Sequence, residues 1–304
     1  SSPHWAWYIT FYFYIGGIAG GAFFLASLLH VFGAPEDRPV VRQGYYIAFA
    51  GAVVSGILLT LDLKRPLRFW HMLIENNTGQ LIFKAWSPMS VGAWGLLLFG
   101  LFAFLATVGA LAEEGKIRWE PVRRLSQATI AWPLAAAVGA IGSFLGFFLA
   151  GYTGVLLSVT NRPIWADSNF VGAVFIFSAA STGAAALILM SRWRGGGHPA
   201  SMHWLSRVDR GALALELLAL IVLVISLGSV AGVLVSAWGV LLVLGVVILG
   251  IVVPFVLEAR SASHVDRRLV TAAALVLFGG FLLRVFIIFS SESIYALGSG
   301  VAMP

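Results

Sequence analysis

A few ionisable and phenolic side chains lie in or beside long apolar runs, where such groups are costly to bury and are often functional. Asp62 ends one apolar run, and Tyr152 lies shortly before the end of another. Arg284 lies at a similar distance from the end of the last run, and Tyr12 and Tyr14 lie one turn inside the first. If these ends share one face of the protein, the five side chains converge at one depth.

These residue types suit the binding of a quinone headgroup. Its carbonyl oxygens need hydrogen-bond donors, and oxidation of a quinol releases protons that a carboxylate or an imidazole must accept. Tyr152 is therefore the candidate donor, and Asp62 and His71 are candidates to carry protons outward. The structural alternatives are an interhelical hydrogen bond for Tyr152, a surface charge paired with Lys64 or Arg65 for Asp62, and a loop-shaping role for His71.

The other candidates also have alternatives. Arg284 serves equally well to neutralise Asp62 across the bundle, and Tyr12 and Tyr14 suit a belt of interfacial aromatics. Glu216 is a candidate for a proton path from the cytoplasmic side, but a carboxylate that reaches the interface or pairs with Arg210 fits its position as well. Glu258 ends a helix and is expected to be solvated.

The composition is that of a membrane protein. Of the 304 residues, 60% are hydrophobic and only 11% are charged, with a mean hydropathy of +0.93, whereas soluble domains carry about 25% charged residues. The net charge of +6 is spread over short loops, so it does not indicate nucleic-acid binding. No cleavable signal peptide is expected, because the first apolar run is long and lacks a basic flank.

The residues that are missing exclude several cofactors. The sequence has no cysteine, so it cannot hold an iron–sulfur cluster by thiolates. The six histidines lie at expected helix ends or in loops, whereas a haem between membrane helices needs two axial histidines inside the membrane. No zinc-ligand spacing is present, so we expect no haem and no metal bound by this chain.

Eight apolar runs are long enough to cross a bilayer about 30 Å thick, and they predict an all-α integral membrane protein. We expect residues 1–304 to form one membrane domain with two four-helix halves, 1–158 and 159–304. The glycines of the first and fourth runs predict close helix packing. The eight expected spans are 8–32, 44–61, 91–111, 129–158, 170–190, 213–230, 238–257 and 270–289. The break between the sixth and seventh is inferred from length, because one helix over 213–257 would far exceed the bilayer.

The lysines and arginines of the loops predict the orientation. With eight spans, one face holds thirteen of the 19 basic residues and the other face holds five. Because cytoplasmic loops carry the excess of Lys and Arg, both termini and the loop 62–90 are expected on the outer, periplasmic face.

Several motifs carry a resemblance to a known family. The loop reads DLKRP at 62–66, RFWHML at 68–73 and KAWSPMS at 84–90, and the later sequence reads YTG at 152–154, RPIW at 162–165 and GGFLLR at 279–284. Together with eight spans, these motifs resemble the polysulfide reductase membrane-anchor family, the NrfD/PsrC-type quinol-interacting subunits. The resemblance covers most of the sequence.

The resemblance implies a haem-free anchor that binds menaquinone or ubiquinone near the periplasmic face of the bacterial cytoplasmic (inner) membrane. Electrons would pass to or from a four-cluster ferredoxin-like iron–sulfur subunit, which contacts a molybdopterin catalytic subunit or a multihaem cytochrome of a respiratory complex. The loop 62–90 would dock a partner subunit. By the same resemblance, Tyr152 matches the quinone-contacting tyrosine and Asp62 the acidic residue after the second helix, and Tyr12 or Tyr14 replaces a histidine found in some members.

Two other functional classes compete with this interpretation. A proton or solute transporter of the inner membrane would have helices broken by Gly or Pro around buried charges at mid-membrane, and that signal is weak here. A purely structural anchor would not need Tyr152 and Arg284 inside its spans. Co-purification of a quinone and an iron–sulfur subunit would favour the redox anchor.

Overall fold

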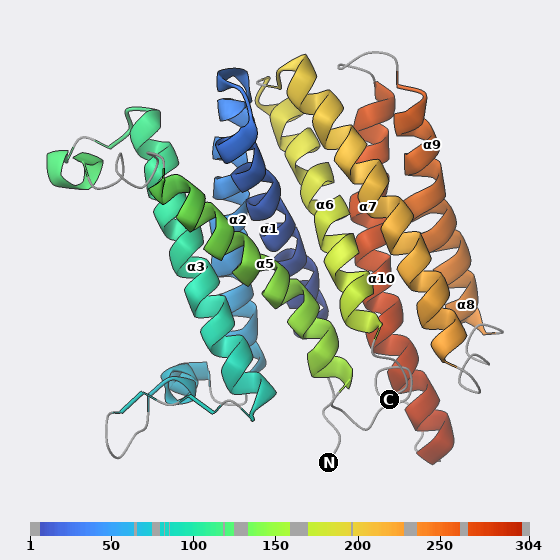
Figure 1. The fold of residues 1–304 in the computed structure, drawn as a ribbon. Coiled ribbons are helices and arrows are strands. Elements are labelled where there is room, and N and C mark those ends of the chain that lie inside the picture. Colours follow the sequence, from blue (N-terminus) through green and yellow to red (C-terminus); the bar gives the residue numbers. More distant parts are fainter. Residues whose placement is uncertain are drawn as a thin grey trace.

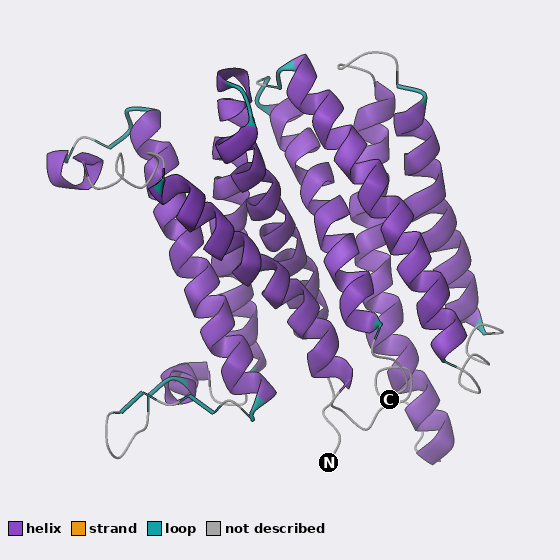
Figure 2. Ribbon diagram, viewed as in Figure 1, coloured by secondary structure: helices purple, strands orange, loops and turns teal. Residues whose placement is uncertain are grey.

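The computed structural model describes residues 7–63, 66–74, 80–81, 83–84, 86–117, 119–124, 133–158, 170–195, 197–227, 236–261 and 267–299. Within these ranges the protein is helical, and an isolated bridge between Ile74 and Leu81 is the only β pairing (Figure 2).

The helices follow one another as antiparallel rods (Figure 1). The rod Ala237–Ala259 is continuous: α8 (Ala237–Val240) leads into η4 (Leu241–Val252), which has π-type hydrogen bonding, and then into α9 (Val253–Ala259). The short helices η1 (Pro35–Asp37) and η2 (Pro66–Met72) lie in connections. The other helices are α1 (Trp7–Phe32), α2 (Arg38–Asp62), α3 (Pro88–Glu113), α5 (Leu134–Ser158), α6 (Val171–Trp193), α7 (Pro199–Ser226) and α10 (Arg267–Ser299).

Seven helical segments among the described residues are long and apolar enough to cross a membrane, so this is a multi-pass membrane protein. The long helix outside this set is α7, whose 28 residues include Asp209, Arg210 and Glu216. The expected break in 213–257 is present, since α7 ends at Ser226 and α8 begins at Ala237.

The largest differences from the expected spans are at α7 and α10. The expected span 213–230 begins too late, because α7 starts at Pro199, with His198 as its N-cap. The expected span 270–289 ends too early, because α10 continues to Ser299. Hydropathy marks the apolar part of a helix, whereas the helix itself continues until a breaker ends it, and the segment after Phe289 has no proline and no glycine before Gly298.

Helix α1 lies at the centre of the fold and packs against α2, α5 and α6. The close packing expected for the glycines of the first and fourth runs is confirmed at Gly20, where an added Cβ would lie 2.6 Å from the carbonyl oxygen of Gly146 in α5. At Gly183 of α6, an added Cβ would lie 2.5 Å from the carbonyl carbon of Gly21. The groups α1–α5 and α6–α10 therefore meet along α1 and α6, and their buried residues form one core.

Figure 1 shows that α1 begins and α10 ends on the side where α2 ends and α3 begins. Helix η2, which belongs to the 62–90 segment, lies on this same lower side. We refer to it as the η2 side, and to the opposite side, where α9 ends and α10 begins, as the α9 side.

Candidate functional site

Tyr152 and Tyr12 form one group near the η2 side. Tyr152 donates a hydrogen bond to the carbonyl oxygen of Pro88, in the first turn of α3. The ring of Phe148 stacks on Tyr152 with centroids 5.6 Å apart at 24°. Tyr12 is only 2% exposed and interacts electrostatically with Tyr152. Helices α1, α3 and α5 thus bring two phenols and a flat aromatic wall together.

A glycine makes this arrangement possible. A Cβ at Gly92 of α3 would lie 2.5–2.7 Å from atoms of the Tyr152 ring and 2.6 Å from its hydroxyl oxygen. Contacts that short do not occur, so a larger residue at position 92 would displace the phenol from the first turn of α3. The position of Tyr152 therefore depends on Gly92.

Arg284 and Tyr14 belong to a second group. Arg284 is 1% exposed, and its Nη1 donates to the hydroxyl oxygen of Ser178 and, at 3.0 Å, to the carbonyl oxygen of Gly280. Its guanidinium carbon lies 5.0 Å from the centroid of the Phe175 ring. Tyr14 donates to the carbonyl oxygen of Leu277 at 2.8 Å, which ties α1 to α10.

Glu216 joins this second group from α7. It is 3% exposed, and Ser181 donates to its Oε2 at 3.1 Å. Arg284 interacts electrostatically with both Glu216 and Tyr14. The alternative in which Glu216 reaches the interface is therefore wrong. The acidic residue that interacts with Arg284 is therefore Glu216, not Asp62 of the structural alternative.

The five side chains expected to converge are thus divided by α1. Residues two apart on an α-helix point about 200° apart. Tyr12 accordingly joins Tyr152 on one side of α1, and Tyr14 joins Arg284 on the other.

Asp62 and His71 lie on the η2 side. Asp62 is the last residue of α2 and its side chain is exposed. His71 is half-buried in η2, with its ring centroid 3.8 Å from that of Trp70. Lys64 and Arg65, the expected partners of Asp62, lie outside the described residues, as does the RPIW motif at 162–165.

Two buried carboxyl groups were not identified from the sequence. Asp209 of α7 is 0% exposed and Glu258 of α9 is 4% exposed, so the expectation that Glu258 is solvated is wrong. Asp209 precedes Glu216 by seven residues, which places both on one face of α7. That spacing was the available signal for Asp209, whereas the burial of Glu258 depends on the packing of α7 against α9.

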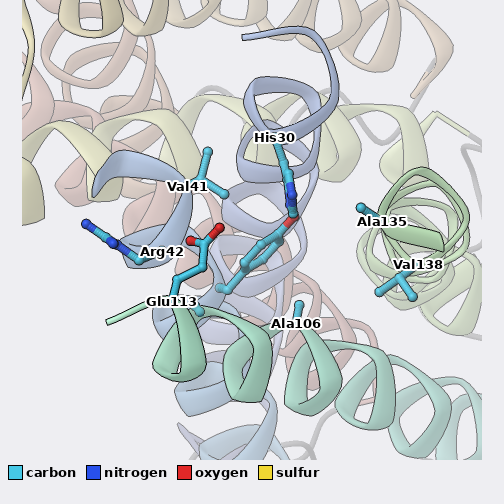
Figure 3. Close-up of a pocket in the computed structure, with 9 residues that line it drawn as sticks. His30, Val41, Arg42, Ala106, Glu113, Ala135 and Val138 are labelled. Carbon is cyan, nitrogen blue, oxygen red and sulfur yellow. The ribbon is translucent and has the colours of Figure 1, made fainter. Parts of the chain in front are cut away.

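A cavity outside both groups is drawn in Figure 3. It is lined by His30, Val41, Arg42, Tyr45, Ala106, Ala110, Glu113, Ala135 and Val138. His30 follows Tyr12 by eighteen residues, about 27 Å along α1. His30 Nδ1 and the Tyr45 hydroxyl oxygen are 2.9 Å apart. This cavity is therefore not part of the site around Tyr152. Among the described residues, no group of three His, Asp or Glu side chains has metal-binding geometry.

Several known proteins resemble this protein over most of its length. Residues 1–296 match the family described as "Polysulphide reductase, NrfD". Protein NrfD of Escherichia coli (strain K12) is 27% identical over 95% of both sequences. The C component of polysulfide reductase from Wolinella succinogenes is 25% identical, over 95% of the present sequence and 94% of the relative. The C component of selenate reductase from Mesobacillus selenatarsenatis is 22% identical, over 64% of the present sequence and 50% of the relative. The chain therefore belongs to the NrfD polysulphide reductase family, whose named relatives include components of a polysulfide reductase and a selenate reductase.

Proposed function

We propose that this chain is the quinone-reactive membrane anchor of a respiratory reductase complex. It would exchange electrons between menaquinone or ubiquinone and a four-cluster iron–sulfur subunit, which in turn contacts a molybdopterin catalytic subunit or a multihaem cytochrome. Two relatives are named as components of a polysulfide reductase and a selenate reductase, which supports partner subunits with catalytic activity. Because the sequence has no cysteine, any cluster would have to be held by a partner.

The pairing of Tyr152 with Tyr12 beside Phe148 is the observation that carries the proposal. A quinone headgroup needs hydrogen-bond donors and a flat apolar wall, and these three side chains supply both within one small region. The Tyr152 hydroxyl donates to the carbonyl oxygen of Pro88. A headgroup that takes this hydrogen bond has to replace that carbonyl as the acceptor. The types of these three side chains match the donors and the wall that the group needs.

Each side chain has a distinct role in this proposal. The bound quinone supplies the two-electron chemistry. Tyr152 donates a hydrogen bond to a headgroup oxygen, Tyr12 supports Tyr152, and Phe148 forms the wall. Asp62 is exposed at the end of α2 and accepts released protons from the site, with His71 beside the aqueous phase as a further acceptor.

We further propose that α7 is the eighth span and that the η2 side faces the periplasm. The large apolar side chains of α7, Leu215, Leu218, Ile221 and Ile225, are 46–75% exposed, whereas Glu216 is buried. This is the pattern of a helix with lipid on one face and a polar protein interior on the other. The basic residues, concentrated on the α9 side, support a cytoplasmic position for that side, so the 62–90 segment would dock the partner subunits outside the inner membrane.

Replacement of Tyr152 by Phe tests the site. The substitution removes one hydroxyl and little volume, so assembly with the partners should persist while quinol-linked turnover falls by about tenfold, the loss of one hydrogen bond worth about 1.4 kcal/mol. The matched control is Tyr45→Phe, which removes a buried hydroxyl at the far end of the same group of helices. Equal turnover of wild type and Tyr152→Phe, with unchanged quinone affinity, would remove Tyr152 from the site.

Replacement of Asp62 by Asn tests the proton acceptor separately. If Asp62 accepts protons, the pH profile of quinol oxidation should change, because the amide cannot take up a proton at any pH used. A variant with the wild-type pH profile would leave Asp62 a structural role alone.

A further inference from the structure

Asp209 and Glu258 lie next to each other between α7 and α9, outside the proposed quinone site. Asp209 is 0% exposed and Glu258 is 4% exposed. The two side chains interact electrostatically. Ser206 donates to Glu258 Oε2 at 3.1 Å, and Arg210 contributes a positive charge. This cluster lies toward the α9 side, where α9 ends.

The hydrogen bonds of this pair can be satisfied only with a proton. Two ionised carboxylates are both acceptors and cannot donate to each other. Both oxygens of Asp209 and Oε1 of Glu258 are buried and have no hydrogen-bond donor among the described residues. A single O–H placed between the two groups supplies the missing donor, and it removes the repulsion of two buried like charges.

The charge balance of the cluster agrees with this proton count. Arg210 is the cation that acts on Glu258. One carboxylate neutralises that cation, whereas two carboxylates would leave an uncompensated negative charge, which is costly in a buried position. The remaining carboxyl group is therefore more stable with its proton.

The pair is also linked to the second group of the functional site. Asp209 interacts electrostatically with Glu216, which follows it by two helical turns on the same face of α7. Glu216 in turn interacts with Arg284, and Arg284 with Tyr14. Buried ionisable groups thus continue from the end of α9 through α7 to α10 and α1.

We propose that Asp209 and Glu258 share one exchangeable proton, taken from the α9 side, and that this pair is a proton-loading site for Glu216 and Arg284. The proposal goes beyond the quinone site and does not depend on it. The proton moves between solvent and the carboxyl oxygens, and no covalent bond other than O–H forms or breaks.

Infrared difference spectra of the purified complex in H₂O and D₂O test the shared proton. Wild type should show a deuterium-sensitive C=O band of a protonated carboxyl group near neutral pH. Asp209→Asn and Glu258→Gln should each lose this band, whereas Glu113→Gln, which changes an exposed carboxylate, should keep it. Both variants should fold, because an amide of the same size supplies the missing donor.

The coupling to Glu216 has its own measurement. Glu216→Gln removes a negative charge that favours retention of the proton, so the pH at which the band titrates should fall. The proposal would be overturned if wild type lacked the band, if the band survived in both single variants, or if Glu216→Gln left its titration unchanged. Loss of the band on addition of sodium at constant pH would also overturn it, since the pair would then be a cation site. None of these outcomes depends on quinone turnover, which tests the proposed function separately.

Discussion

The interaction between Arg284 and Glu216 gives a quantitative test of how the α6–α10 group is held together. Arg284→Met keeps the length of the side chain but removes its charge, which leaves Glu216 with hydroxyl donation from Ser181 and without its positive neighbour. A buried charge that loses its compensating charge costs about 3–5 kcal/mol. Glu216→Gln is expected to cost less, about 2 kcal/mol, because Ser178, Gly280 and Phe175 still contact the guanidinium.

The double variant distinguishes a coupled pair from two independent residues. With both charges gone, no uncompensated charge remains in the core, so the combined cost should fall short of the sum of the single costs by about 2 kcal/mol. The assay is reversible unfolding of the purified protein in one detergent, with the free energy of unfolding measured for wild type, both single variants and the double variant.

A surface pair provides the control cycle. Arg38 and Glu113 lie 3.2 Å apart with side chains 37% and 25% exposed. Their coupling should be at most about 1 kcal/mol, because solvent screens exposed charges. If the costs at Arg284 and Glu216 add without a remainder, the two charges do not stabilise each other, and the description of the second group fails.

Two further predictions concern helix packing and pH. Gly20→Ala should cost about 1–3 kcal/mol of unfolding free energy, because the new methyl group meets the α5 backbone. The control is Gly56→Ala, where nothing lies within 4 Å of the added atom. In thermal unfolding this control should be neutral or slightly stabilising. Burial raises the pKa of Glu114, but the hydrogen bond and charge of Lys116 and the charge of Arg42 outweigh it and lower the pKa below its ordinary value of 4.5. A carboxyl group with a lowered pKa stabilises the fold at pH values above 4.5, and this effect is lost as the pH falls through the lowered pKa. Glu114→Gln should therefore be less stable than wild type at pH 7, by under about 1 kcal/mol, and equally stable in acid.

The long apolar helices could be predicted from the sequence, because a bilayer demands continuous apolar length. The end of α2 at Asp62 and the break before α8 follow from the same reasoning. The family could also be identified from the loop motifs. The need to cross a bilayer does not dictate which residues occupy these loops, so their identities are specific to the family.

The grouping of the polar residues could be predicted only in part. The shared depth of Tyr12 and Tyr14 predicts one site for both, although helix geometry alone places them on different faces of α1. The electrostatic interaction of Arg284 with Glu216 could not be predicted, because it depends on which helices are neighbours. Likewise, Glu258 is buried because α7 covers it, and a residue at a helix end gives no sign of that cover.

Helix α7 shows why average hydropathy misjudges a helix in this bundle. Its charged residues lower the mean over any window, but the mean does not distinguish faces. Asp209 and Glu216 are buried against the bundle, whereas Leu218 and Ile225 are 57% and 75% exposed. A soluble amphipathic helix has the opposite pattern, with its apolar face buried. The same charges that exclude α7 from the apolar set therefore mark it as the helix on which the buried ionisable groups of this protein are organised.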